Sequence, residues 1–211
     1  AGIVTVGVVD FNGCSAQATI NITQPAQLNP GTIAADQVIC YGDNPAILTE
    51  SSAATGGPSA YNYQWQSSTN IAGPFINIAG ATLNQYTPPA GAAYTLYYRR
   101  MVTSGICMPQ YSNVVEVLVN PRPVALLTGG ETICPGQSSV IRVTMLAGTG
   151  PFTVEIANHG VVNNYISGAD IVVTPAVTTT YTLTRVRDAN NCEVVSPSPN
   201  LNGTATVTVS D

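Results

Sequence analysis

The chain has 211 residues, of which 45% are hydrophobic and only 8% are charged, and its formal net charge is −5. The apolar residues alternate with Thr, Ser, Asn and Gln, and no run approaches the roughly 20 residues that a membrane-spanning helix needs. The six basic residues are scattered along the sequence, so it offers no electrostatic footprint for nucleic acid or for an anionic membrane surface.

Residues 1–25 have the pattern of a β-hairpin. Ile3–Val9 and Ala18–Ile22 alternate as strands do, and Asp10–Gly13 between them is a turn that ends just before Cys14. The other repeats of this chain are about two-thirds complete where the same hairpin occurs. We therefore expect residues 1–25 to be the last two strands of a preceding repeat, and the chain to be part of a longer protein.

Two further copies of the hairpin define two whole repeats, residues 26–120 and 121–211. The first ends with a strand over 94–102, a turn before Cys107 and a strand over 114–119. The second ends in the same way, with Cys192 after the turn. The prolines of the linkers 25–30 and 120–123 fix φ and remove a donor, so we expect these joints to be stiff.

Each whole repeat also begins with a related turn. Cys40-Tyr-Gly-Asp43 and Cys134-Pro-Gly-Gln137 both place glycine two residues after cysteine, where a tight turn needs a positive φ. Short strands and frequent turns, with no amphipathic helix, fill about ninety residues per repeat. The sequence therefore predicts an all-β protein of tandem immunoglobulin-like β-sandwich domains.

The five cysteines and the Thr-, Ser- and Asn-rich composition predict an oxidising, extracellular setting. One scheme pairs cysteines within repeats, Cys40 with Cys107 and Cys134 with Cys192, and leaves Cys14 unpaired. In an immunoglobulin-like sandwich these turns lie at opposite ends, about 25 Å apart, whereas a disulfide needs Cα atoms within about 7 Å. The alternative scheme pairs Cys40 with Cys192 across the joint, and the sequence leaves both schemes open.

Several segments resemble repeats of giant secreted surface proteins of the Bacteroidota. The segment 97–107, with Ser112-Asn113, 63–68 and 73–81, follows their immunoglobulin-like pattern, and Asp10–Cys14 and Asp188–Cys192 look like the turn of related adhesin and PKD-like repeats. The match covers most of residues 31–120, and the centre of the last repeat departs from it by lacking the Trp. The resemblance implies type IX secretion and display in gliding-type adhesins or other long fibres.

No residue pattern predicts catalysis, a cofactor or a metal. The single histidine, His159, sits in a turn-like stretch without a second ligand nearby, and the eleven carboxylates are spread singly. Asp10 and Asp188 could offer oxygens to calcium, although such residues at hairpin turns usually bond their own backbone. We therefore expect a protein that is not an enzyme.

Three functions fit these observations. The first is a structural and adhesive segment of a long extracellular fibre, whose partners are neighbouring repeats or further copies. The second is an accessory or spacer module of a secreted hydrolase that binds polysaccharide through aromatics such as Trp65 or Tyr86, although Trp65 also fits a core position on the third strand. The third is a filament subunit in which residues 1–25 complete the sandwich of another copy.

Overall fold

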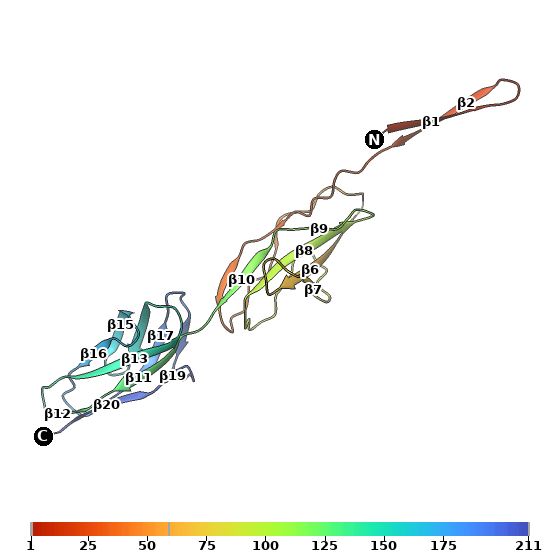
Figure 1. The fold of residues 1–211 in the computed structure, drawn as a ribbon. Coiled ribbons are helices and arrows are strands. Elements are labelled where there is room, and N and C mark those ends of the chain that lie inside the picture. Colours follow the sequence, from red (N-terminus) through yellow and green to blue (C-terminus); the bar gives the residue numbers. More distant parts are fainter. Residues whose placement is uncertain (1, 59, 211) are drawn as a thin grey trace. The chain divides into compact units, whose positions relative to one another are not determined.

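The structure of the protein is a computed structural model that describes residues 2–58 and 60–210 (Figure 1). These residues form strands and turns and contain no helix. The strands are β1 (Gly2–Val9), β2 (Ser15–Ile22), β3 (Thr32–Ile33), β4 (Gln37–Cys40), β5 (Glu50–Ser52), β6 (Tyr61–Ser68), β7 (Ile76–Asn77), β8 (Leu96–Ser104), β9 (Gln110–Tyr111), β10 (Val115–Asn120), β11 (Val124–Gly129), β12 (Thr132–Ile133), β13 (Ser139–Ala147), β14 (Phe152–Ile156), β15 (Gly160–Tyr165), β16 (Asp170–Val173), β17 (Thr179–Arg187), β18 (Glu193–Val195), β19 (Leu201–Asn202) and β20 (Thr204–Val209).

The chain divides into two compact units. The first unit contains residues 1–35, 47–87 and 96–116, and the second contains 36–46, 88–95 and 117–211. The second unit thus takes in three segments that the sequence assigns to the repeat over 26–120. The division into residues 1–25, 26–120 and 121–211 stays a prediction.

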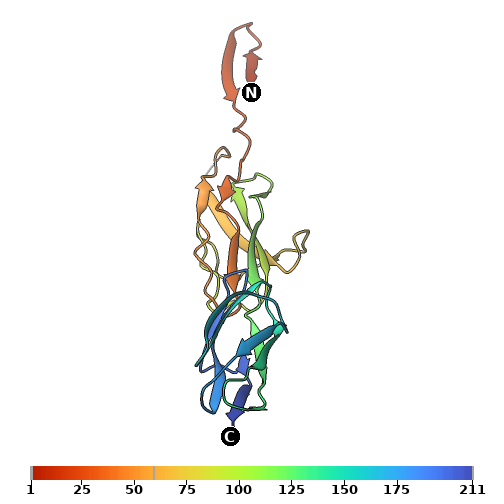
Figure 2. The ribbon, with the colours of Figure 1, turned by 90° about the vertical axis from the view of Figure 1, so that its left-hand side faces the viewer.

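Two large sheets share one strand order (Figures 1 and 2). The first runs β4-β10-β8-β6-β7 with β9 on β8, and the second runs β12-β20-β17-β14-β15 with β18 on β17. In both, a short early strand lies parallel to the last strand, since β4 pairs with β10 and β12 with β20. An early strand parallel to the last one, beside antiparallel pairs such as β6–β8 and β14–β17, fits an immunoglobulin-like sandwich, and the all-β class predicted from the sequence is confirmed.

In the second unit a four-stranded sheet, β16-β13-β11-β19, packs against the sheet that contains β17 and β14. Ile141 and Val143 of β13 meet Val154 of β14 and Val186 of β17 in the core, and all four side chains have no exposed area. The period of two along each strand directs every second residue into this core.

The first unit has a core that includes Trp65, Tyr98 and a cluster of Leu28, Ala54 and Val102. Its second sheet holds only β3 and β5, and Leu48 forms an isolated bridge with Tyr86. In the second unit, Ala46 exchanges two hydrogen bonds with the side chain of Gln37. That side chain takes the place of a strand partner.

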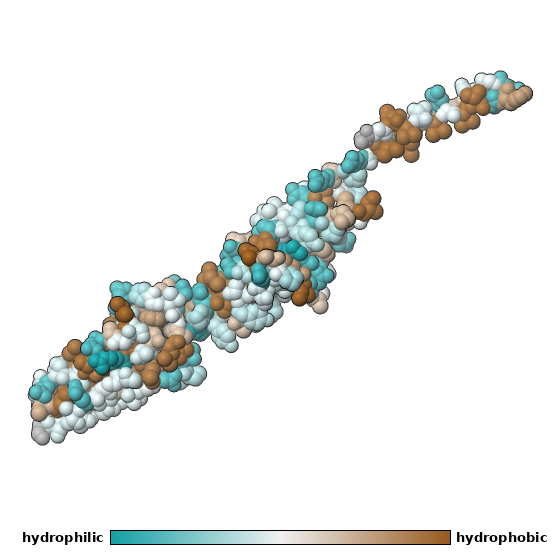
Figure 3. Space-filling view, viewed as in Figure 1, coloured by the Kyte–Doolittle hydropathy of each residue, from teal (hydrophilic) through white to brown (hydrophobic). Residues whose placement is uncertain are grey.

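The hairpin β1–β2 is paired over its whole length, from Gly2 opposite Ile22 to Val9 opposite Ser15. Every residue in the two strands is exposed, and apolar side chains of the hairpin appear brown on the side drawn in Figure 3. This is the two-stranded element expected over residues 1–25. Whether it completes the sandwich of another copy stays a prediction.

Candidate functional site at the Cys40–Cys192 disulfide

A disulfide joins Cys40 at the end of β4 to Cys192 just before β18; their Cα atoms are 5.6 Å apart and the two residues are separated by 152 in sequence number. Both cysteines belong to the second unit. This is the pairing of the second scheme, and it rules out a bond between Cys40 and Cys107. Cys14, Cys107 and Cys134 carry free thiols.

Cys40 is held by a tight turn. The backbone N–H of Asp43 donates to the Cys40 carbonyl oxygen at 2.9 Å, and a carboxylate oxygen of Asp43 accepts from the Cys40 N–H at 3.1 Å. Gly42 has a φ of +84°, which residues with a side chain rarely adopt. The turn is pinned from outside by bonds from the N–H of Tyr41 to the Asn120 carbonyl and from the N–H of Gly42 to the Ala92 carbonyl, both 2.8 Å.

Cys192 is held by the buried carboxylate of Asp188, which is 4% exposed. One oxygen of Asp188 accepts from the N–H groups of Asn190 and Cys192 at 3.0 and 2.9 Å, and the other accepts from the N–H of Thr149 at 3.1 Å. A carboxylate that accepts hydrogen bonds from several backbone N–H groups recovers much of the free energy that its burial costs. The Asp at this turn, which the sequence left open as a calcium ligand, therefore bonds its own backbone.

Arg122 connects the two sides of the disulfide. Its guanidinium donates to the Tyr41 carbonyl at 2.9 Å and to the Asp43 carboxylate at 2.5 Å on one side, and to the Glu193 carbonyl at 2.7 Å on the other. A planar fork of donors suits arginine for such a bridging role. Sequence reasoning missed this residue, and the available signal was a lone Arg between two prolines of the linker.

The position of Trp65 contradicts the hypothesis that this residue binds polysaccharide. Its side chain has no exposed area, and its ring N–H donates to the Leu83 carbonyl at 2.9 Å, so it belongs to the core and cannot stack on a surface sugar. Tyr86 is half-buried, with its ring 5.8 Å from those of Trp65 and Tyr98. It lines a shallow pocket of about 240 Å³.

The sequence 97–100 splits between two faces of β8. Tyr98 and Arg100 point into the first unit, and Tyr97 and Arg99 lie on the outer face. Arg99 lies over the ring of Tyr111, 4.0 Å from its centroid. As expected from the alternation of a strand, at most half of this segment shares one surface.

The remaining candidates form no chemical site. In the described part of the chain, no group of three or more His, Cys, Asp or Glu side chains could hold a metal ion. His159 is exposed in the turn before β15. No helix with the length and hydropathy of a membrane span occurs among residues 2–58 and 60–210.

Comparison with known proteins finds one family model that matches part of the chain. Residues 29–121 match a family described as Domain of unknown function (DUF8696). No curated protein matches the chain.

Solved structures with similar folds have low identity. The fibronectin(III)-like modules of Clostridium thermocellum CbhA are 12% identical, with a TM-score of 0.37 over 85% of this chain and 94% of that one. A three-domain immunoglobulin segment of titin is 10% identical, with a TM-score of 0.47 over 100% and 75%. The FN1-FN3 domains of chicken CNTN1 are 14% identical, with a TM-score of 0.34 over 88% and 68%. The fold seen in the strand order is typical of structural and adhesion-type modules.

Proposed function

We propose that the chain is a structural and adhesive segment of a long extracellular surface fibre, in which adjacent repeats are fastened by disulfides. The observation that carries this proposal is the Cys40–Cys192 disulfide, which ties the repeat predicted over 26–120 to the repeat predicted over 121–211. The bond links these two predicted repeats covalently, at Cys40 of one and Cys192 of the other. Its use is to resist their separation when the chain is pulled.

The surroundings of the disulfide support the same role. Arg122 lies in the linker between the predicted repeats and donates to backbone on both sides of the bond. Pro121 and Pro123 on either side of it restrict the linker backbone. Covalent, ionic and conformational restraints thus act on the same few residues.

The disulfide also supports an extracellular location, because such bonds persist in oxidising compartments. Together with the resemblance of 97–107 and of the Asp-x-Asn-x-Cys turns to Bacteroidota surface repeats, it favours export by the type IX system and display on the cell surface. The partners are then neighbouring repeats of the fibre. No ligand other than protein is needed for this function.

Non-reducing peptide mapping of the chain excised from its native protein tests the first step. It should recover Cys40 and Cys192 in one linked pair of peptides. Small-angle scattering should then show a wider distribution of interatomic distances for the double variant Cys40→Ser/Cys192→Ser than for the wild type. Cys14→Ser is the matched control, since Cys14 is free and exposed. Identical scattering from the double variant and the wild type would contradict the proposal.

A further inference from the structure

Four of the five cysteines fall into two structural types, and Cys134 is of the same type as Cys40. Each lies at or just after the end of a short strand that runs parallel to the last strand of its sheet. In each turn the fourth residue returns two bonds: Gln137 donates its N–H to the Cys134 carbonyl at 3.1 Å and accepts from the Cys134 N–H at 3.4 Å. Gly136 has a φ of +83°, against +84° for Gly42. Cys134 differs in being exposed and free.

Cys107 is of the same type as Cys192. Each follows a long strand, β8 or β17, that lies beside the last strand of its sheet, β10 or β20. Each precedes a short strand, β9 or β18, that pairs back onto this long strand. Cys107 is partly buried and packs against the core of Leu28, Ala54 and Val102. Of these two cysteines, Cys192 forms a disulfide, and its partner Cys40 lies in a turn of the first type.

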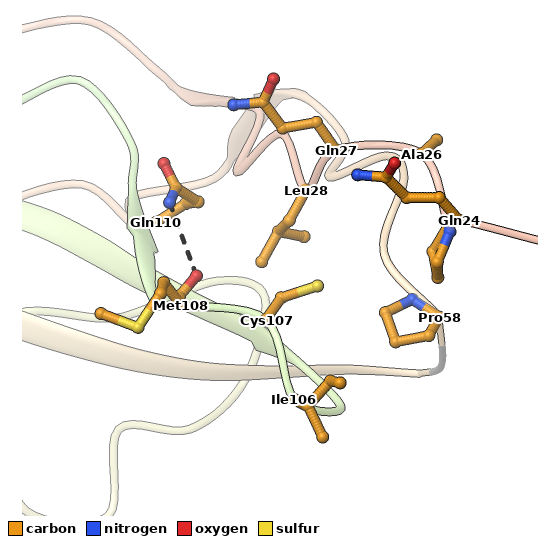
Figure 4. A pocket seen from close by; sticks show the side chains of 10 residues that line it. Gln24, Ala26, Gln27, Leu28, Pro58, Ile106, Cys107, Met108 and Gln110 are labelled. Carbon is orange, nitrogen blue, oxygen red and sulfur yellow. Dashed lines mark hydrogen bonds between the residues drawn. The ribbon is translucent and has the colours of Figure 1, made fainter. Parts of the chain in front are cut away.

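A pocket of about 500 Å³ opens beside Cys107 within the first unit (Figure 4). Its lining combines the linker residues Gln24 to Leu28 with Pro58 and with Ile106 to Met108 and Gln110. The Cys107 sulfur points into the space between Leu28 and Pro58 (Figure 4). In the second unit the corresponding place, beside Cys192 and the linker residue Arg122, is occupied by the Cys40–Asp43 turn.

We propose that the Cys107 pocket is the docking site for the Cys134–Gln137 turn of a second copy of the chain, closed by a Cys107–Cys134 disulfide. The occupant is identified by the second unit, where a turn with the same bonds sits against a cysteine of the same type. One chain carries both halves of the contact on different surfaces. Such a heterologous contact propagates head to tail, and it yields open chains where the rotation does not close a ring.

The covalent step needs an oxidant, and a small-molecule disulfide supplies it. The Cys134 thiolate attacks this disulfide, forms a mixed disulfide and releases one small thiol. The Cys107 thiolate of the other copy then attacks the Cys134 sulfur and releases the second thiol. Two protein thiols lose two electrons and two protons in total, and one small disulfide becomes two small thiols.

This proposal rests on the proposed function and deepens it, because it names the partner of the module and the site that receives it. The test uses full-length chains that keep the Cys40–Cys192 disulfide. An acceptor, Cys14→Ser/Cys134→Ser, retains only the Cys107 thiol, and a donor, Cys14→Ser/Cys107→Ser, retains only the Cys134 thiol. The two carry tags of different mass and are mixed at equal concentration in a glutathione redox buffer.

The mixed dimer should predominate over both homodimers, and peptide mapping should place its bond between Cys107 and Cys134. A second acceptor, Cys107→Ser/Cys134→Ser, presents the exposed Cys14 without the pocket and should form far less mixed dimer. Gly136→Val in the donor keeps the thiol but disfavours the positive φ of the turn, and should lower the yield with the Cys107 acceptor.

A statistical mixture, in which half of the dimers are mixed and half are homodimers, would overturn the proposal. So would equal yields from the Cys107 and Cys14 acceptors. Either result would leave the proposed function standing if the Cys40–Cys192 bond is still recovered. Loss of that bond in the native protein would instead remove the proposed function as well. Circular dichroism of each variant checks that it is folded.

Discussion

The guanidinium of Arg122 donates a hydrogen bond of 2.7 Å to the backbone carbonyl of Glu193, the residue that follows Cys192. The same group donates at 2.9 Å to the carbonyl of Tyr41, the residue that follows Cys40. The two residues adjoining the disulfide are therefore held by one side chain. This arrangement limits the motion that a reductant needs in order to approach the sulfur atoms.

Arg122→Ala should accelerate reduction of the disulfide by roughly five-fold, corresponding to about 1 kcal/mol of lost local stability. The figure is modest because a third of the Arg122 side chain is exposed, so water screens its interactions. The measurement is the rate of reduction by dithiothreitol with the free thiols blocked beforehand. Arg142→Ala is the control, since Arg142 forms an exposed pair with Asp170 away from the disulfide. Equal rates for Arg122→Ala and the wild type would contradict the role assigned to Arg122.

Asp188→Ala should destabilise the second unit by about 2–3 kcal/mol, because three backbone N–H groups lose a charged acceptor in a buried turn. Asp10→Ala is a matched control in the exposed hairpin. Asp10 accepts from the N–H groups of Asn12 and Cys14 at 2.9 and 2.8 Å, which water can replace. Urea denaturation checks the prediction, and equal effects of the two variants would contradict the importance of burial.

The period of two and the turn residues were enough to predict the strands that form the cores. The strand predicted over 94–102 overlaps β8 (Leu96–Ser104), for example. The contacts around the linker 120–123 could not be predicted, because they depend on where three segments that are far apart in the sequence meet. The sequence left two disulfide schemes open, one within repeats and one across the joint, and the position of Cys40 beside Cys192 decides between them. Arg122 could not be predicted because its partners are mostly backbone carbonyls, which leave no trace in sequence.

For Trp65, the sequence predicted the strand but could not decide which way the side chain faces. An aromatic residue on a predicted strand can face the core or the solvent, and composition cannot decide between the two when one sandwich face is polar. In the structure Trp65 faces the core, where the Leu83 carbonyl accepts a hydrogen bond from its indole N–H and the ring of Tyr86 packs nearby. The sequence signal that favoured the core was the position of Trp65 on the third strand.

Arg100→Ala should destabilise the first unit by about 3 kcal/mol. The Arg100 side chain is fully buried, lies 3.4 Å from a Glu50 carboxylate oxygen and donates to the carbonyls of Asn84 and Pro30. Removing it leaves a carboxylate and two carbonyl groups without their donor. Thermal unfolding followed by circular dichroism measures the change. Arg99→Ala on the outer face of the same strand should cost much less, and a larger cost there would contradict this assignment.

Trp65→Ala should destabilise the first unit by about 3–5 kcal/mol and impair its folding, because it empties a large, fully buried site. Any loss of polysaccharide retention in this variant would therefore follow from unfolding. Tyr86→Phe keeps the ring packing and removes only the hydroxyl group. Affinity electrophoresis with soluble polysaccharides should show the same mobility for Tyr86→Phe and the wild type. A folded Tyr86→Phe variant with altered retention would revive the carbohydrate-binding hypothesis.

The stability of the second unit should fall as the pH rises above about 10, the ordinary pKa of tyrosine. Burial raises the pKa of Tyr165 in the folded state, and its hydroxyl group donates to the Ala169 carbonyl at 2.7 Å. Between the unfolded and folded pKa values the unfolded chain loses a proton that the folded chain keeps, so deprotonation favours unfolding. The contribution of Tyr165 is fully present below pH 10 and is lost as the pH passes through its folded pKa. Tyr165→Phe removes this proton, so the variant should be less stable at pH 8 but should lose stability less steeply above pH 10. Urea unfolding from pH 8 to 11, with all free thiols alkylated, tests this, and parallel profiles for Tyr165→Phe and the wild type would contradict it.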